Sequence, residues 1–487
     1  MDEIKDQREV HAYAVKPASL ANMTDEDIIA LDKKMVRKMD LVIMPIIGIL
    51  YILNYVDRQN LAAAKLQGVM TDLNMSEEQF ATAISILFVG YIPFQIPSNL
   101  LISRLNRPGL YICGACMLWG TVSAMTALVK TYEQLLVVRV FLGMTEAVFF
   151  PGVIYYLSAW YVKQELGKRL AGLFIAQQLG NAFGGLIAAG VLTMGSRLGI
   201  ASWRWLFIIE GVITVGCGAI FIFLMPEYPH KARMLSPIEK DYAVWRLESE
   251  AGQTEAKETI GTLQSFLMAL KDVRVYTLIF CMMMSQGMGT ITNFFPAIVS
   301  SLGYTNFISL LLVAPPYILA CFIFWGLSYW SDKKQTVYWL LMGCLATMLP
   351  LYVIPLATTN TAARYFAMML IPGVGVCPQI FLYKTMNLHN ARPHTKRAAG
   401  VALMNAIGGT SNIWASYCWK NPPRYFEGFG TLMGLAVVFM LVITGYRFFV
   451  HKQNRMLDSG DETQIKKVMK HGVTQEQVDM GWRYECY

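Results

Sequence analysis

Long apolar stretches recur along the chain and set its hydrophobic pattern. About 20 consecutive apolar residues form a helix long enough to cross roughly 30 Å of hydrocarbon. The pattern predicts an all-α integral membrane protein with twelve transmembrane helices, over residues 41–60, 80–102, 109–129, 134–157, 169–193, 203–225, 275–299, 307–330, 335–356, 364–387, 398–419 and 428–450. The first span ends in Asp57 and Arg58, and the tenth contains Lys384, so these two are the weakest.

Polar segments divide the apolar stretches into two groups of six. The predicted order is a cytoplasmic tail over 1–38, a six-helix bundle over 39–226, a cytoplasmic linker over 227–272, a second bundle over 273–450 and a cytoplasmic tail over 451–487. The two halves resemble each other weakly, because Lys168–Gly172 and Lys396–Gly400 each start with a basic pair and end in glycine. Similar repeats at corresponding places indicate a duplicated unit, a construction found in secondary transporters.

Composition and charge agree with this reading. Apolar residues make up 55% of the 487 positions and charged residues only 15%, where a soluble domain carries roughly 25% charge. Lysines and arginines concentrate in the loops that share one side when the N-terminus is inside, which places both termini in the cytoplasm. The net charge of +8 is explained by this bias and requires no nucleic acid partner.

Two opposite charges lie within the fourth apolar segment. Arg139 and Glu146 are seven residues apart, about two helical turns, so they share one helix face. Charges inside a membrane are costly and usually face a bundle interior or an aqueous pathway. The pair therefore predicts a site that handles anions or protons. The alternative is a structural salt bridge that ties this span to a neighbour.

Further polar residues within spans complete the candidate pathway: Asn54, Gln286, Asn293, Lys384 and Asn387. Ordinary hydrogen bonding between helices is the alternative for the amides. Asp57 and Arg58 either gate the outer mouth or extend toward water, and Glu210 is interpreted as structural. The sequence contains no Walker loop, Gly-x-Ser-x-Gly or His-Glu-x-x-His motif. It therefore predicts no enzyme, metal or bound cofactor, and transport energy that comes from an ion gradient or from the substrate's own gradient rather than from ATP.

Four local motifs carry a resemblance to a known family. They are Tyr55-Val-Asp57-Arg58-Gln-Asn60, Arg139-x-x-x-Gly143-x-x-Glu146-Ala147-x-x-x-Pro151-Gly152, the string Trp203-Arg-Trp-Leu-Phe-Ile-Ile-Glu210-Gly211, and Thr395-Lys396-Arg397. The string from Trp203 to Gly211 is the most specific. With these motifs the chain resembles the major facilitator superfamily. Within it, the chain is most similar to the fungal anion:cation symporters, the branch of allantoate permease and of relatives for nicotinate, pantothenate and biotin.

The resemblance implies roles for individual residues. Arg139 resembles the superfamily arginine associated with proton transfer, and Glu146 resembles a carboxylate that is protonated during coupling. Lys384 lies near the inner end of a span that lines the cavity in this fold, so it either binds an anion or extends toward water. In the general loop motif of the family, Ser103 replaces the usual aspartate of the first half. The second half keeps Asp332 and Lys333, which, like Lys396 and Arg397, are expected to be gating or structural charges.

The resemblance also implies a function. It predicts alternating-access, proton-coupled uptake of a small organic anion (a carboxylate, vitamin or ureide), by a monomer in the lipid bilayer of a fungal plasma membrane. The coupling ion would come from the proton gradient. Two alternatives use the same fold: an exporter of a secondary metabolite, and a nutrient sensor that no longer transports.

Overall fold

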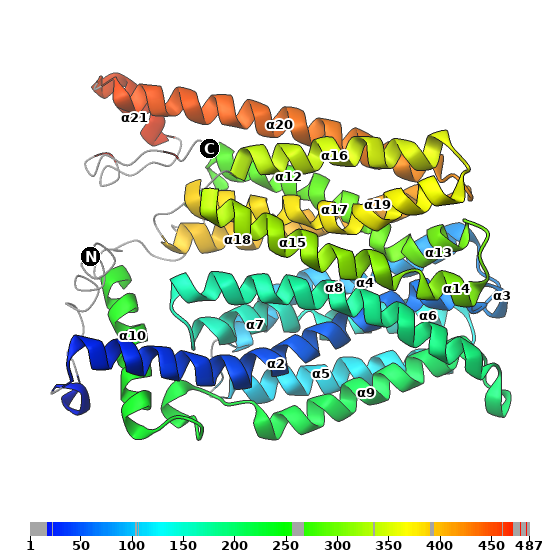
Figure 1. Ribbon diagram of the computed structural model, residues 1–487, viewed down its shortest axis with the longest axis horizontal. Coiled ribbons are helices and arrows are strands. Elements are labelled where there is room, and N and C mark those ends of the chain that lie inside the picture. Colours follow the sequence, from blue (N-terminus) through cyan, green and yellow to red (C-terminus); the bar gives the residue numbers. More distant parts are fainter. Residues whose placement is uncertain are drawn as a thin grey trace. The chain divides into compact units, whose positions relative to one another are not determined.

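The computed structural model describes residues 17–21, 23–102, 105, 107–255, 267–334, 337–389, 394–459, 461–470, 478 and 484. All regular secondary structure in these residues is helical, which confirms the all-α membrane fold (Figure 1). Nine segments in the described residues are long and apolar enough to cross a membrane, rather than the twelve expected. Helix α4, the pair α12 and α13, and the pair α18 and α19 occupy the other three predicted spans.

The first half of the chain contains these helices: η1 (Ala18–Leu20), α2 (Asp25–Leu66), α3 (Val69–Asp72), α4 (Glu77–Ile102), α5 (Pro108–Met125), η2 (Thr126–Leu128), α6 (Tyr132–Glu146), α7 (Phe149–Ser158), α8 (Lys163–Met194), η3 (Arg197–Gly199), α9 (Ser202–Leu224), η4 (Pro229–Lys231) and α10 (Pro237–Glu255). The second half contains α12 (Val273–Gly289), η5 (Thr290–Phe294), α13 (Phe295–Ser300), α14 (Asn306–Leu311), α15 (Ala314–Lys334), α16 (Val337–Ala357), α17 (Thr361–His389), α18 (His394–Gly409), α19 (Ser411–Ala415), η6 (Ser416–Cys418), α20 (Phe426–Asp458) and α21 (Glu462–Lys470).

Three predicted spans are helices interrupted by short breaks. The fourth span consists of α6 and α7, and α6 ends at Glu146. Pro151 has no N–H to offer the carbonyl of Ala147, which accounts for the break. The seventh span is interrupted by η5, between Gly289 and Pro296, and the eleventh breaks after Gly409. Such breaks shorten the continuous helix below the length of a full span.

One compact unit of the structure is formed by Met1–Asn60, Val89–Gly184 and Met194–Thr259. Its helices α5 and α9 touch through their backbones, since a Cβ atom on Gly211 would lie 2.6 Å from the carbonyl oxygen of Gly120. Small residues permit this close approach between membrane helices. The contact leaves no room for water between α5 and α9 beside Gly211.

The other compact unit is formed by Leu61–Phe88, Gly185–Thr193 and Ile260–Tyr487. In this unit, predicted outer ends of first-half helices contact second-half residues. Lys420 forms an ion pair with Glu78 at 2.8 Å, and the Thr82 and Tyr417 hydroxyl groups are 3.0 Å apart. The predicted outer end of α4 is therefore in direct contact with η6 and with the segment between η6 and α20.

Candidate functional site

A buried ion pair joins the first and fourth predicted spans. Arg58 Nε of α2 donates to Glu146 Oε2 of α6 over 2.7 Å. Glu146 is completely buried and the Arg58 side chain is 17% exposed. The guanidinium group lies 4.7 Å from the ring centre of Tyr91 and 5.4 Å from that of Tyr55. Arg58 therefore points into the helix bundle and does not extend to water.

Arg139 belongs to the same site. It is 3% exposed and interacts electrostatically with both Glu146 and Arg58. Helical spacing predicts that Arg139 and Glu146 lie on one face, but the ion pair of Glu146 is with Arg58, for which the sequence predicts either gating of the outer mouth or extension toward water. The three side chains together carry one positive charge when all are ionised.

Aromatic rings surround these charges. Tyr51 of α2 stacks on Phe149 of α7 with ring centres 5.8 Å apart, and on Phe150 at 6.1 Å. Its ring also meets the edge of Tyr55 at 5.1 Å. Aromatic faces attract cations and exclude water, so they hold Arg58 in a low-dielectric environment where its pairing with Glu146 is strong.

Asp57 lies next to Arg58 in the chain and faces other partners. It is completely buried, and its carboxylate accepts hydrogen bonds from Trp119 Nε1 at 3.0 Å, Ser123 Oγ at 3.2 Å and Thr214 Oγ1 at 3.2 Å. Like Arg58, Asp57 does not extend to water. Asn54, one turn earlier on α2, is buried as well.

The remaining pathway candidates lie in the other compact unit. Lys384 Nζ of α17 donates to Ser331 Oγ of α15 over 3.1 Å. Gln286 Oε1 accepts from Asn412 Nδ2 over 3.4 Å. Asn293 lies half-buried in η5, and Asn387 is exposed near the end of α17. These contacts tie helices to one another in pairs and do not gather the four residues into one cluster.

A charged cluster ties α12 to α18 outside the predicted spans. Lys396 Nζ and Arg274 Nη2 each lie 2.6 Å from Asp272 Oδ2. Burial alone would raise the pKa of Asp272, but the hydrogen bonds and charges of Arg274 and Lys396 outweigh it and hold this pKa below its ordinary value. The Asp272 carboxylate therefore stays ionised at neutral pH and binds the two helix starts together.

Other predicted gating charges are more peripheral. Arg397 is half-buried and Lys333 is exposed. The side chain of Asp332, and Ser103 of the first loop motif, lie outside the described residues. In the described part of the chain, no group of three His, Cys, Asp or Glu side chains is arranged to hold a metal ion.

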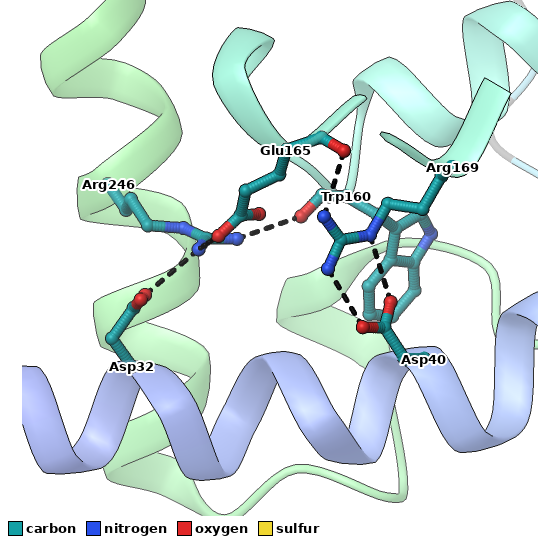
Figure 2. A network of polar contacts seen from close by, with 6 residues as sticks. All are labelled: Asp32, Asp40, Trp160, Glu165, Arg169 and Arg246. Carbon is teal, nitrogen blue, oxygen red and sulfur yellow. Dashed lines mark hydrogen bonds and ion pairs between the residues drawn. The ribbon is translucent and has the colours of Figure 1, made fainter. Parts of the chain in front are cut away.

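A second polar network connects the linker helix α10 to α2 and α8 (Figure 2). Arg246 Nη1 of α10 contacts Asp32 Oδ1 at 2.9 Å and Glu165 Oε1 at 3.0 Å, and Nη2 donates to the Trp160 carbonyl at 3.1 Å. Arg169 binds Asp40 through two hydrogen bonds, of 2.9 and 2.8 Å. The linker helix is therefore fixed to the first half of the chain.

Replacing Arg246 with alanine is expected to lower the free energy of unfolding. The change leaves Asp32, Glu165 and the Trp160 carbonyl without their shared donor, and Arg246 is 7% exposed. We expect a loss of about 2 kcal/mol, discounted from a fully buried pair because the two carboxylates are partly exposed. Thermal unfolding of the detergent-purified protein measures it. Lys466→Ala, which breaks an exposed pair with Glu462, is the control; an equal effect from both changes would contradict the prediction.

Comparison with known proteins gives the class of this chain. The Major Facilitator Superfamily matches residues 47–416. An uncharacterized transporter of Schizosaccharomyces pombe is 32% identical over 430 residues, which cover 87% of this chain and 88% of the relative. The high-affinity nicotinic acid transporter of Saccharomyces cerevisiae is 28% identical, covering 89% of this chain and 82% of its own. The chain belongs to the Major Facilitator Superfamily.

Solved structures show the same fold. The crystal structure of a D-xylose-proton symporter matches with a TM-score of 0.62 at 15% sequence identity, covering 82% of this chain and 97% of that one. The protein is thus a multi-pass membrane transporter and not an enzyme, as the sequence predicted.

Proposed function

We propose that this transporter couples the uptake of a small organic anion to a proton, and that Arg58, Arg139 and Glu146 form the coupling site. The observation that carries the proposal is the ion pair between Arg58 and Glu146 beside a second buried guanidinium. In this ion pair Arg58 is the donor and Glu146 is the acceptor. The carboxylate of a substrate can replace the Glu146 carboxylate as the partner of Arg58.

Protonation of Glu146 makes the exchange possible. A neutral Glu146 no longer holds Arg58 by charge, so the guanidinium group becomes available to an incoming carboxylate. Arginine suits this role because its planar fork binds a carboxylate through two parallel hydrogen bonds. Proton and anion therefore bind together, and each favours the binding of the other.

Charge balance gives the stoichiometry. Before binding, Arg58 and Arg139 are balanced by Asp57 and Glu146. One proton on Glu146 adds one positive charge, and one monocarboxylate cancels it. A neutral complex avoids the cost of moving net charge through the bilayer. We therefore propose one proton for each monovalent anion, with no net charge moved.

The site and one relative support a substrate class. The aromatic rings around Arg58 favour a carboxylate attached to an apolar or planar body. The relative from Saccharomyces cerevisiae is named for nicotinic acid, which has this chemistry. We also propose that the protein works as a monomer in a fungal plasma membrane. The proton gradient across that membrane points inward, so transport coupled to it is inward as well.

Uptake into proteoliposomes tests the proposal. The purified protein is given a panel of labelled monocarboxylates, nicotinate included, under an imposed pH gradient, with valinomycin and potassium setting the membrane potential. We expect a labelled monocarboxylate to accumulate inside the proteoliposomes. A protonophore should abolish this accumulation, and a membrane potential of either sign should leave it unchanged. Nicotinamide, which has the same ring without the charge, is the matched control. The proposal would be contradicted if none of the acids in the panel is taken up, or if the rate of uptake depends on the membrane potential.

A further inference from the structure

A third buried carboxyl group, Glu210 of α9, lies outside the coupling site. It is 1% exposed. Within the part of the chain that the structure describes, neither of its carboxylate oxygens accepts a hydrogen bond of normal geometry. The other two acids that are buried within the predicted spans of this compact unit differ, because Asp57 has three donors and Glu146 has Arg58. An ionised carboxylate with no donor is far too costly to keep in a dry interior, and such a group takes up a proton instead.

The surroundings of Glu210 supply no compensating charge. Asp57 of α2 acts on it electrostatically, and its hydrogen-bonding neighbour is the uncharged Asn60 amide, whose contact falls short of normal geometry. Helix α5, which packs on α9, contains no charged residue. The other charged residue of α9, Arg204, donates to the carbonyls of Ala127 and Val129 at 2.6 Å each. The charge nearest to Glu210 is therefore negative, which also disfavours its ionised form.

The helix contact next to Glu210 limits the space for water beside it. Glu210 is followed by Gly211, where α9 touches the backbone of α5 at Gly120. Hydration of a carboxylate requires space for several molecules, and the backbone contact removes that space on one side.

We propose that Glu210 is a second proton-binding site, in which a carboxylic acid is kept neutral throughout the transport cycle beside the Asp57 carboxylate. Glu146 is then the one acid of the three whose charge changes. The permanent proton on Glu210 makes the resting site neutral, so an arriving anion meets no excess negative charge. This consequence for coupling rests on the proposed function, whereas the proton on Glu210 does not.

Infrared spectroscopy of the purified protein tests the protonation directly, without transport. At pH 7.5 the spectrum of the wild type minus that of Glu210→Gln should contain the carbonyl stretching band of a neutral carboxylic acid. Glu146→Gln is the matched variant and should keep this band. A difference spectrum that contains carboxylate bands instead would overturn the proposal, because Glu210 would then be ionised. The same holds if these carboxylate bands are present only in a buffer that contains sodium.

A second measurement covers the case in which Glu210→Gln fails to fold. Glu146→Gln protein labelled with glutamate carrying ¹³C in its side-chain carboxyl group should show a shifted carboxylic acid band at pH 7.5. Exposed glutamates are ionised at this pH, so they do not contribute to the band. The absence of a shifted band would overturn the proposal. In transport, Glu210→Gln should keep proton-driven uptake within about twofold of the wild type, and a loss larger than tenfold would mean that the proton on Glu210 moves.

Discussion

Glu146→Gln is expected to abolish proton-driven accumulation of the anion while leaving the protein folded. Glutamine keeps the size and hydrogen bonding of glutamate but cannot gain or lose a proton, and it leaves Arg58 permanently available. Exchange of labelled for unlabelled substrate across the membrane should therefore persist. Accumulation under a pH gradient should fall to the level of protein-free liposomes, and the rate of exchange should no longer depend on pH.

Glu133→Gln is the matched control for this experiment, because Glu133 is an exposed carboxylate on the same helix α6. It should accumulate substrate like the wild type. If Glu146→Gln still accumulates substrate with the wild-type pH dependence, the coupling proton binds elsewhere and the role of Glu146 is structural.

Replacement of Arg58 should weaken anion binding more than any other single change at the site. Arg58→Ala removes the donor and leaves Glu146 buried without its cation, so we expect no measurable uptake. Arg58→Lys keeps the charge but loses the planar fork. Loss of one charge-assisted hydrogen bond is worth about 1.5 to 3 kcal/mol, and each 1.4 kcal/mol is tenfold, so apparent affinity should fall roughly 10- to 100-fold. The apparent affinity is measured by the competition of unlabelled with labelled substrate.

Arg139→Ala is the comparison variant within the site, and Arg37→Lys, at an exposed position on α2, is the control outside it. We expect Arg139→Ala to abolish uptake as well, since the charge balance requires both guanidinium groups. Normal affinity in Arg58→Lys would show that Arg58 does not contact the anion. If Arg139→Ala transports normally as well, the anion site lies elsewhere, with Lys384 as the next candidate.

The sequence predicted the fold class and the position of Arg139 and Glu146 on one helix. The length and hydropathy of the apolar segments are properties of each segment by itself, so the all-helical membrane fold follows from them directly. The same holds for Arg139 and Glu146, because helical periodicity places residues seven apart on one face. The motif from Trp203 to Gly211 pointed to the family, and the family match over residues 47–416 confirmed it.

The partners of these residues could not be predicted in the same way. Arg58 reaches Glu146 across 88 positions of sequence, and such a contact depends on how two helices pack rather than on any periodicity. The isolation of Glu210 depends on the contact of Gly120 with Gly211, which is also a property of the pair of helices. Nine described segments qualify as spans rather than twelve. Two of the other three predicted spans contain helix breaks, before Pro296 and after Gly409, and a hydropathy pattern does not register a local break.

The attachment of α10 determines where the gene can be divided. Every ion pair that α10 makes in the described residues is with the first half of the sequence, through Arg246 and through Glu239, which binds Lys38 at 2.6 Å. A cut between the codons for Glu255 and Leu267 keeps all of these contacts within one polypeptide, whereas a cut before Pro237 separates them. Two co-expressed fragments made at the later position would keep every ion pair of α10 within the first fragment, and the Lys420–Glu78 pair would be the ion pair of the described residues that connects the two fragments.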